Sequence, residues 1–553
     1  MTDPQAVAGA LRANRPQPKA SRNAAHNILH GTQLSGRATI HGTAAYAARM
    51  VGLSPAGSLA HGFTSLGSTG LTISRLGFGT YRVETRTEEH REALKKALAG
   101  GCNLIDTSTN YMDGDSERLV GSVLDEFVKA GRISREDVVI ISKIGYVQGD
   151  NLKLAQAREQ SGRPYPEMVK YGDGIWHCLH PEFLADQLAL SLDRLGLATL
   201  DVCLLHNPEY FLSEAARRGE RDLARLRNTF YERLQRAFGY CEAQVQAGRL
   251  QYYGVSSNTV TSAPDDPDAT ALDRMLQAAQ AAAQRAGLPT HHFRVLQCPM
   301  NLFESGAALM ANTGTDTRQT LLELAQQERL AVLVNRPLNA MPAGRGGLLR
   351  LADLPLEDQP VDFPAQRQRV AELEEEYRRV IAPSVQQSGQ GMVPSEFFNW
   401  AHELERIHPQ IQGLEHWEQI EHQMIAPHVN QVLQALSRHL SGTMAEQWEA
   451  WRDRYLPELL TLLRGLRREA TERSRQRTAL VAGTLDPLLP AERRSESLSR
   501  KALWILASTP GVTSVLNGMR TPAYVEDALA VLHWPLLQPV TSVYKTLKAV
   551  AFP

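Results

Sequence analysis

Eight short apolar segments alternate with amphipathic segments along most of this chain, and the alternation limits the folds open to it. These segments are rich in aliphatic and β-branched residues: 74–80, 103–108, 138–143, 201–206, 252–257, 294–300, 330–337 and 512–518. Several are almost continuously apolar, which is typical of strands in a parallel sheet whose outer face is covered. We therefore interpret the eight segments as strands of one parallel sheet.

The segments between these strands have helical spacing. Residues 88–99 carry apolar side chains three and four apart and end before Gly100, while residues 181–195 begin with Pro181 and end before Gly196. Further helices are expected over 116–130, 269–286 and 318–328. Strands that alternate with helices form right-handed parallel β/α units, and eight such units close into a barrel. The predicted fold class is α/β, a (β/α)8 TIM barrel.

The interval between the seventh and eighth strands is too long for one β/α connection. It contains Trp400, Trp417, Trp448 and Trp451, four of the seven tryptophans of the chain. Tryptophan at this density indicates a packed core or an interface. We expect a large α-helical insertion between strands 7 and 8, with helices over 366–381, 394–407, 416–440 and 444–468.

The predicted domain organisation follows from these assignments. It comprises an N-terminal extension (1–62), the barrel with strands 1–7 (63–345), the helical insertion (346–498), and the completion of the barrel by strand 8, the last helix and a tail (499–553). No Asp or Glu occurs between Gln5 and Val83. A loosely docked arm, with a short docking helix over 43–53, is the simpler interpretation, and an organelle transit peptide is the alternative.

Composition excludes several classes of protein. The chain has 59 Lys and Arg against 60 Asp and Glu, a formal charge of -1, so no basic excess indicates a nucleic-acid partner. No segment approaches the roughly 18 uninterrupted apolar residues of a membrane-spanning helix. Five cysteines without a CxxC motif fit a reducing compartment. We expect a cytoplasmic protein, with import into an organelle through the acid-poor N-terminus as the alternative.

Four polar residues lie at or just after the ends of three predicted strands: Asp106, Tyr111, Lys143 and His206. In a β/α barrel the carboxyl ends of the strands meet on one face, which carries the active site. Each residue alone has a simpler interpretation, as a solvated or hydrogen-bonded loop residue. Together they complement one another chemically, and we expect them to lie close together.

This set of side chains suits proton transfer to a carbonyl oxygen. A free tyrosine has a pKa near 10 and is a weak acid at neutral pH. A neighbouring ammonium group such as Lys143 favours the phenolate, and His206 can share the proton through a hydrogen bond. A buried lysine needs a counter-charge, which Asp106 can supply. Because no nucleophile is needed, the second reagent is expected to be a hydride donor.

With this set of residues, the chain resembles the aldo-keto reductase superfamily. The residues that carry the resemblance are LGSTGLTISRLGFGTYRV from Leu66, NLIDTSTNYMDGDSE from Asn103, VVIISK, DVCLLHNPE, YYGVSSN, VLQCPMN and WILASTPGVTSVLNGMRTPAYVEDAL. They cover roughly 66–345 and 499–532. The resemblance implies catalysis by Tyr111, with Lys143 and His206 tuning its proton and Asp106 pairing with the lysine.

The resemblance also implies NADP(H) as cofactor, with NAD(H) as the alternative, bound over the barrel mouth without a GxGxxG motif. The positions similar to the family's cofactor contacts are Thr80, Tyr81, Ser256, Ser257, Asn258, Gln297, Asn335, Arg336, Gly518 and Arg520. The chain departs from the family pattern after the fifth, seventh and eighth strands. After the eighth, Tyr524 stands where Arg or Gln is common and Ala528 where Asn is common. Ser257 occupies the usual place of an amide residue, which Asn258 follows, and Asn335 stands where an aromatic ring usually stacks on nicotinamide.

The resulting hypothesis is an NAD(P)H-dependent oxidoreductase that reduces an aldehyde or ketone, or oxidises an alcohol or sugar. The long loop 145–177, the insertion and Tyr81 are expected to wall the pocket for a small carbonyl or alcohol. The alternative is a cofactor-binding regulatory or scaffold protein with little turnover. In either case the insertion offers a surface for a protein partner or self-association. The histidines of the insertion form no recognisable ligand motif, so no metal is expected.

Overall fold

The computed structural model describes residues 33–314, 318–341, 348–356, 359–385 and 394–549. Eight parallel strands form a closed barrel, which confirms the predicted fold class. Around the barrel they follow the order β3 (Leu76–Gly79), β4 (Leu104–Asp106), β5 (Val139–Ile144), β9 (Leu200–His206), β10 (Leu250–Ser256), β11 (Phe293–Pro299), β14 (Ala331–Asn335) and β17 (Ser514–Gly518). Each coincides with one of the eight apolar segments.

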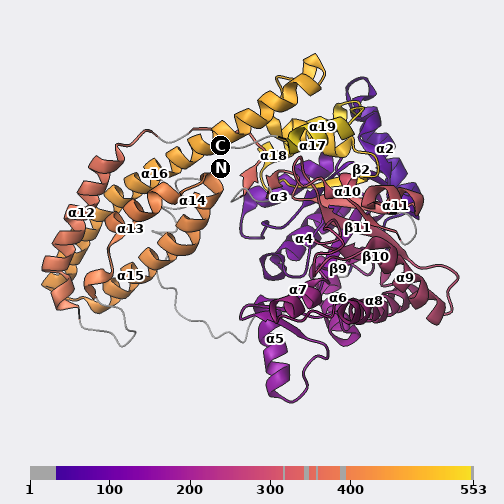
Figure 1. Ribbon diagram of the computed structural model, residues 1–553, viewed down its shortest axis with the longest axis horizontal. Helices are drawn as coiled ribbons and strands as arrows, with labels where there is room; N and C mark the ends of the chain where they lie inside the picture. Colours follow the sequence, from indigo (N-terminus) through magenta and orange to yellow (C-terminus); the bar gives the residue numbers. More distant parts are fainter. Residues whose placement is uncertain (1–32, 315–317, 342–347, 357–358, 386–393, 550–553) are drawn as a thin grey trace. The chain divides into compact units, whose positions relative to one another are not determined.

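At least one helix follows each barrel strand in the sequence, and eight of these helices surround the barrel (Figure 1). These helices are α3 (Glu88–Ala99), α4 (Asp115–Lys129), α6 (Pro181–Leu195), α8 (Leu223–Gln246), α9 (Leu272–Arg285), α11 (Leu321–Gln327), α17 (Leu498–Ala507) and α18 (Pro522–Leu529). The bounds of α3 and α6 agree with the sequence prediction residue for residue. Helix α8 was not predicted, although it buries Leu226, Phe230 and Leu234 at a spacing of four residues.

A hairpin of β1 (Phe63–Ser65) and β2 (Thr72–Ser74) closes the amino end of the barrel. Its apolar residues Leu66, Leu71 and Ile73 are fully buried. They belong to one cluster with residues near the starts of the strands, among them Leu104 and Val139. Since this end is filled with apolar side chains, polar chemistry is confined to the opposite, carboxyl end of the strands.

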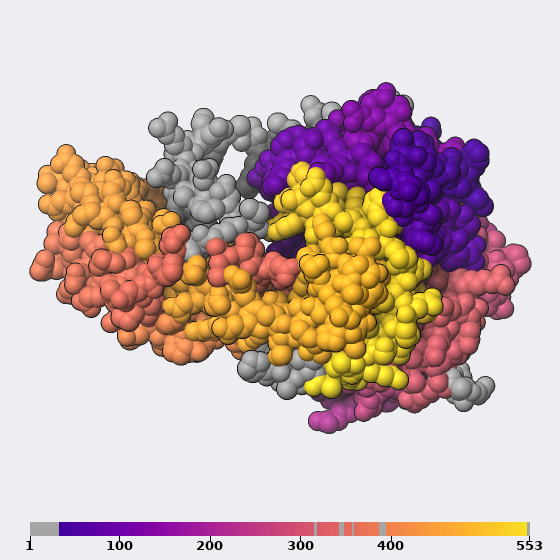
Figure 2. All heavy atoms as spheres, turned by 90° about the horizontal axis from the view of Figure 1, so that it is seen from above, coloured from indigo at the N-terminus to yellow at the C-terminus, as the bar shows by residue number. Residues whose placement is uncertain are grey.

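The residues before the hairpin dock on the barrel. Helix α2 (Ile40–Leu53) begins at Thr39, whose side chain accepts a hydrogen bond from Gly42 N–H. Buried Asp201 accepts hydrogen bonds from Ala38 N–H at 2.7 Å and from Arg135 at 2.7 Å. The first and last described segments lie side by side (indigo and yellow in Figures 1 and 2), and the Ser58 hydroxyl lies 2.7 Å from His533 Nδ1. Residues 1–32 of the predicted extension lie outside the described residues.

The predicted long loop 145–177 has regular structure, which corrects the sequence interpretation. It contains α5 (Gly149–Gln160) and a three-stranded sheet in the order β6 (Tyr146–Val147), β8 (Ile175–His177), β7 (Val169–Gly172). Smaller elements complete the barrel unit: α7 (Tyr210–Arg217), α10 (Gly306–Leu309), β12 (Ala311–Thr313), β13 (Gln319–Thr320), β15 (Asn339–Ala340) and α19 (Thr541–Lys548).

The chain divides into two compact units. One takes in the described residues of Gly31–Ala340 and Gly483–Ala551, and the other those of Met341–Ala482. The insertion was predicted over 346–498, whereas residues 483–498 cluster with the barrel in this division. The helical unit lies in the sequence between β14 and β17, which are neighbours in the barrel.

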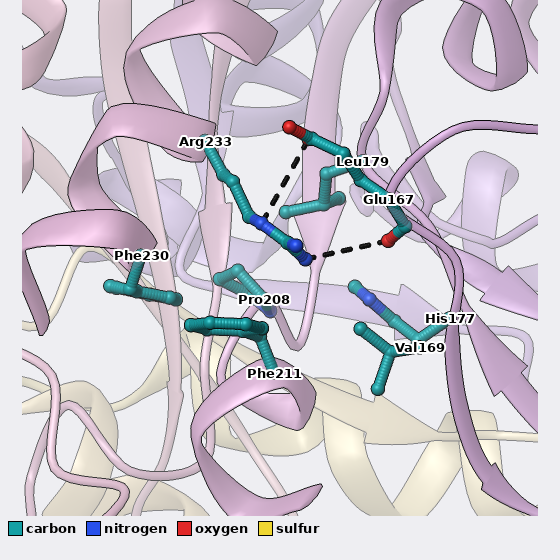
Figure 3. A pocket seen from close by; sticks show the side chains of 8 residues that line it. All are labelled: Glu167, Val169, His177, Leu179, Pro208, Phe211, Phe230 and Arg233. Carbon is teal, nitrogen blue, oxygen red and sulfur yellow. Dashed lines mark hydrogen bonds and ion pairs between the residues drawn. The ribbon is translucent and has the colours of Figure 1, made fainter. Parts of the chain in front are cut away.

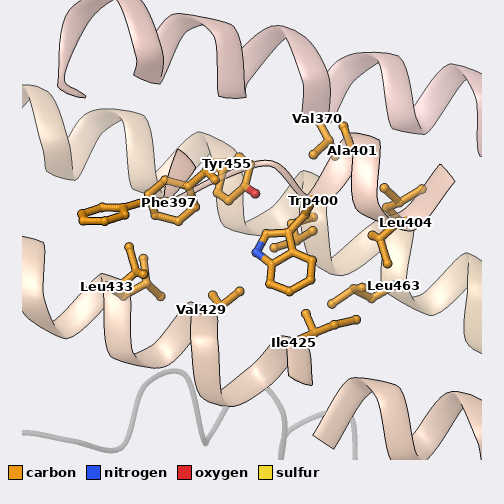
Figure 4. Packing of buried hydrophobic residues seen from close by; sticks show 14 of the residues in the cluster. Val370, Phe397, Trp400, Ala401, Leu404, Ile425, Val429, Leu433, Tyr455 and Leu463 are labelled. Carbon is orange, nitrogen blue, oxygen red and sulfur yellow. The ribbon is translucent and has the colours of Figure 1, made fainter. Parts of the chain in front are cut away.

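The helical unit has its own apolar core (Figure 4). Its elements are β16 (Leu349–Arg350), α12 (Phe363–Val380), α13 (Trp400–Ile407), α14 (Leu414–Ile420), a π-helical turn (Glu421–Ile425), α15 (Ala426–His439) and α16 (Thr443–Leu485), which runs beyond the unit's last residue. Trp417, Trp448 and Trp451 are almost fully buried. Buried Glu374 accepts hydrogen bonds from Trp400 N–H and the Tyr455 hydroxyl, both at 2.8 Å. Such a core indicates a folded subdomain.

Two glycines give opposite predictions for stability. A Cβ atom on Gly254, in β10, would overlap the Val295 carbonyl oxygen of β11, whereas one on Gly239, in helix α8, would meet nothing within 4 Å. We expect Gly254→Ala to lower the free energy of unfolding by about 3 kcal/mol through overpacking. Gly239→Ala should raise it by about 0.5–1 kcal/mol, because alanine favours a helix. Thermal and denaturant unfolding of both variants measures this, and equal effects would contradict it.

Candidate active site

The barrel brings the four predicted catalytic residues together at the carboxyl ends of three neighbouring strands. Asp106 is the last residue of β4, Lys143 lies near the end of β5, and His206 is the last residue of β9. Tyr111 begins a short turn of helix after β4. Its ring contacts the His206 ring edge to face, with centroids 6.0 Å apart.

Lys143 is the centre of this group. Its side chain is fully buried, and its ammonium group lies 2.6 Å from Asp106 Oδ2 and 3.1 Å from the Tyr111 hydroxyl. It also donates to the carbonyl oxygen of Thr107 at 3.0 Å. Burial lowers the pKa of Lys143, but the charge of Asp106, the neighbouring Tyr111 and the hydrogen bonds to both together outweigh burial and raise it above the ordinary value. The lysine is therefore a fixed positive charge beside the phenol.

The Tyr111 hydroxyl is held in a protonated state at neutral pH. Burial raises its pKa above the ordinary value, the charge of Lys143 lowers it, and the charge of Asp106 raises it again. The exposed ring of Tyr81 packs against Tyr111 edge to face, with centroids 5.2 Å apart. A protonated phenol beside a fixed ammonium group can donate a proton, because the charge stabilises the phenolate that remains.

His206 is neutral in this environment. Burial lowers its pKa well below the ordinary value, and the charge of Lys143 lowers it further. The Ser108 hydroxyl lies 3.0 Å from its Nδ1 atom and also donates to the Asn110 side-chain oxygen at 2.6 Å. Because the Ser108 hydrogen has an acceptor elsewhere, its oxygen can accept from Nδ1–H and fix the orientation of the ring. Sequence reasoning missed Ser108, since a serine after a strand carries no signal of its own.

Gln297 joins the ion pair to the neighbouring strands. Its amide nitrogen donates to Asp106 Oδ1 at 2.8 Å. Its amide oxygen accepts from the Ser256 hydroxyl and from the Asn335 side-chain nitrogen, both at 3.2 Å. Three of the predicted cofactor residues thus form one buried network across β10, β11 and β14, in contact with the charged group.

The other predicted cofactor residues are more widely spread around the barrel mouth. The Ser257 hydroxyl lies 3.1 Å from that of Thr270, and Asn258 is exposed. The Arg336 guanidinium pairs with Glu304 at 2.9 Å. Gly518 ends β17, and Arg520 follows it before α18. A cofactor role for any of these residues stays a prediction.

Several polar atoms on this face fit a bound ligand. Thr80 Oγ1, Asn335 Oδ1 and Arg336 Nε are buried and have no hydrogen-bond partner among the described residues. Unpaired buried polar atoms are costly in folded proteins, and a polar ligand at the barrel mouth would satisfy them. Because these atoms lie at the ends of two strands, β3 and β14, they suit an extended ligand with several acceptors and donors, such as a dinucleotide.

Comparison with known proteins agrees with the geometry. The model of the Aldo/keto reductase family matches residues 75–265. The chain is 31% identical over 150 residues to the NADH-specific methylglyoxal reductase of Escherichia coli (strain K12), a match that covers 26% of this chain and 40% of the relative. The barrel belongs to the aldo-keto reductase superfamily. The predicted resemblance is confirmed.

Other relatives are similar over comparable stretches. A putative voltage-gated potassium channel subunit beta of Schizosaccharomyces pombe is 28% identical over 151 residues, covering 27% of this chain and 37% of the relative. The chain thus spans about 40% of the length of these curated relatives. An aldo-keto reductase of Bacillus halodurans, solved in its holo form, matches 88% of this chain and 97% of its own with 14% identity and a TM-score of 0.43.

Aromatic residues surround the catalytic group of this aldo-keto reductase barrel. Tyr146 of β6 packs edge to face on His206, with centroids 4.6 Å apart, and its hydroxyl accepts from Asn207 at 2.7 Å. Tyr210 packs on Tyr146, and Tyr171 packs on Tyr210. The segment 145–177 therefore contributes aromatic rings beside the predicted catalytic residues, and its role as a wall of the substrate pocket stays a prediction.

His177 is one of the residues that line a small cavity (Figure 3). Its lining residues are Glu167, Val169, His177, Leu179, Pro208, Phe211, Phe230 and Arg233. Arg233 donates to the Glu167 carbonyl oxygen at 3.4 Å, so its charge is engaged within the lining. His177 Nε2 lies 2.7 Å from the His206 carbonyl oxygen, which connects this cavity to the end of β9.

The described residues include neither a cluster of metal ligands nor a helix suited to cross a membrane. No group of three or more His, Cys, Asp or Glu side chains is placed to hold a metal ion there. Within the same part of the chain, no helix is both long enough and apolar enough to span a membrane.

The buried ion pair gives a prediction that is independent of activity. Asp106→Asn leaves the Lys143 ammonium buried without its counter-charge, so we expect the free energy of unfolding to fall by about 3–5 kcal/mol. The double variant Asp106→Asn with Lys143→Met removes both charges and should regain most of that loss. Chemical denaturation of the single and double variants measures both. Additive losses in the double variant would contradict the pairing.

Proposed function

We propose that this protein is an NAD(P)H-dependent oxidoreductase that reduces an aldehyde or ketone, or runs the reverse oxidation of an alcohol. The observation that carries the proposal is the arrangement of Lys143 between Asp106 and Tyr111, with its ammonium group 2.6 Å from the carboxylate and 3.1 Å from the phenol. A charged lysine fixed against a buried phenol is costly unless it serves chemistry at that phenol.

In the proposed mechanism Tyr111 is the general acid. Its hydroxyl donates a proton to the carbonyl oxygen of the substrate, and the phenolate that forms is stabilised by the Lys143 ammonium group. His206, neutral and oriented by Ser108, binds the substrate oxygen beside Tyr111. In the oxidation direction the Tyr111 phenolate takes the proton back from the alcohol. The nicotinamide cofactor, when bound, supplies or accepts the hydride.

The cofactor is proposed to lie along the ends of β3, β10, β11, β14 and β17. Ser256, Gln297 and Asn335 form the polar cradle for the nicotinamide end, and Thr80 and Tyr81 line the mouth beside it. Arg520, before the N-terminus of α18, is the proposed contact for a 2′-phosphate. Because Arg520 can contact this phosphate, we infer NADP(H) as the cofactor. NAD(H) is the alternative, because relatives are named both NADH-specific and NADPH-dependent.

The proposed substrate is a small carbonyl compound. The aromatic rings of Tyr81, Tyr146 and Tyr210 beside the catalytic group would exclude water from the reacting carbonyl. Relatives are named for methylglyoxal and D-xylose, so α-oxoaldehydes and aldoses are the first compounds to test. A cytoplasmic location remains a prediction.

A second candidate function is a regulatory or scaffold protein that binds cofactor with little turnover. The observation that favours it is the helical unit, which has its own core and is not needed to close the barrel. One relative is named as a putative channel subunit. Tight cofactor binding with no turnover of any carbonyl by the wild type would favour this function over the first.

Removal of the Tyr111 hydroxyl tests the mechanism. Tyr111→Phe should lower kcat for carbonyl reduction by about 100–10,000-fold, the range for loss of a general acid, and leave the Kd for NADPH or NADH within a factor of two or so. Steady-state kinetics with aldehydes and ketones, and fluorescence titration of the cofactor, measure the two effects. Tyr252→Phe is the matched control, because Tyr252 packs at the opposite end of the barrel. Equal kcat values for the two variants would refute the role of Tyr111.

The pH dependence should differ in the two directions. Reduction needs the protonated phenol, whose pKa burial raises, so at saturating cofactor kcat should stay level through neutral pH and fall only above about pH 10. Oxidation needs the phenolate and should rise with pH over the same range. Profiles of kcat in both directions measure this. A reduction rate that falls between about pH 6 and 8 would contradict the assignment to Tyr111.

A further inference from the structure

Glu209, three residues after the catalytic His206, has an unusual environment. The side chain is buried, with 3% of the residue exposed. Its Oε1 atom accepts a hydrogen bond from Asn258 N–H at 2.6 Å, whereas its Oε2 atom is buried and has no hydrogen-bond partner in the described part of the chain. The proposed reaction does not use this carboxyl group.

The groups that face Glu209 give its charge no strong support. Tyr146 of β6 and Tyr210 of α7 are close to it, and both phenols have a raised pKa and are neutral. Asp268, in the segment between β10 and α9, adds a like charge. Burial raises the pKa of Glu209 to about 7, and the backbone N–H groups of Glu209 and Asn258, with the Ser257 hydroxyl, only partly offset burial. An ionised carboxylate here makes the folded protein less stable.

The segment that Glu209 holds follows the end of β10, where the cofactor is proposed to bind. Several hydrogen bonds fix this turn, among them a backbone bond from Ser257 N–H to the Gln297 carbonyl oxygen at 3.0 Å. The Ser257 hydroxyl lies 3.1 Å from that of Thr270, the Thr259 hydroxyl donates to the Asp268 carbonyl oxygen at 2.8 Å, and Glu209 accepts from Asn258 N–H. Only the last of these involves a group that can carry a charge, and it connects the turn to the loop after His206.

We propose that Glu209 is a positioning residue whose carboxylate fixes the Ser257–Asn258 turn for the nicotinamide end of the cofactor, at a cost in stability to the cofactor-free protein. The inference rests on the proposed function. Charge-assisted hydrogen bonds are stronger than neutral ones, so the ionised carboxylate holds the turn more firmly than an amide of the same shape would. The residue therefore strengthens cofactor binding and weakens the fold.

The sign of the stability effect follows from linkage. A free glutamate has a pKa of about 4.3, below that of folded Glu209, so the unfolded chain loses this proton at a lower pH than the folded protein does. The contribution of Glu209 to stability therefore falls as pH rises between these two values. Glu209→Gln removes the charge and keeps an oxygen that accepts from Asn258 N–H. A residue with a purely structural role would lose binding and stability together, whereas Glu209→Gln should change them in opposite directions.

The experiment compares wild type, Glu209→Gln and the control Glu214→Gln at pH 5.5 and 8.5. Glu214 lies five residues further on, in α7, and pairs with Arg218. The probes are NADPH, titrated by fluorescence, and the Tm of the cofactor-free protein. The 2′-phosphate of NADPH titrates alike in all three proteins, so the ratio of Kd values between variant and wild type isolates Glu209.

At pH 8.5 we expect Glu209→Gln to bind NADPH about fivefold more weakly than wild type and to have a higher Tm. At pH 5.5 the Kd difference should shrink to within about twofold, because folded Glu209 is then mostly protonated, and the Tm difference should become smaller but keep its sign. The control should match wild type in binding at both pH values. Unchanged binding at pH 8.5, or weaker binding with a lower Tm, would overturn the inference. Failure of the wild type to bind NADPH or NADH would overturn the proposed function and this inference with it.

Discussion

The buried ion pair between Lys143 and Asp106 is the constraint on which the active end of the barrel depends. An ammonium group that is fully buried is stable only against a carboxylate in close contact, here at 2.6 Å. The two residues meet because β4 and β5 are parallel neighbours with Asp106 opposite Ile141, two residues before Lys143. The register of β4 and β5 therefore places the two charges in contact, and the ion pair in turn stabilises that register. Tyr111 is positioned by its place after β4 and by its contact with Lys143.

The rest of the barrel divides its polar and apolar residues around that pair. At the amino end, the hairpin side chains Leu66, Leu71 and Ile73 pack with strand residues in one buried apolar cluster. At the carboxyl end, Gln297 extends the ion pair to Ser256 and Asn335, so the polar network reaches three further strands. One end thus supplies stability, and the other holds buried polar groups, some still unpaired, that suit a ligand.

The sequence predicted the barrel well because its signals are local. Several strands are almost continuously apolar, and Asp106, Lys143 and His206 stand at or near the ends of such runs. The residues that sequence reasoning missed, Ser108 and Glu209, act through hydrogen bonds to groups 98 and 49 positions away, and such partners are visible only in the folded chain. The sheet in segment 145–177 was not predicted for a related reason. Its strands have only two to four residues, which is too short for a recognisable alternation of apolar and polar residues.

The departure at Asn335 shows how the site differs from the usual family arrangement. An aromatic ring at this place would hold a nicotinamide by stacking, an interaction that tolerates sliding along the ring face. Asn335 instead donates to Gln297 and extends a directional network. Without a stacking ring, the position of the cofactor would depend more on hydrogen bonds from the opposite side, where Ser256 and the turn held by Glu209 lie. Without the stacking contact, the order of the turn held by Glu209 would therefore matter more for the position of the cofactor.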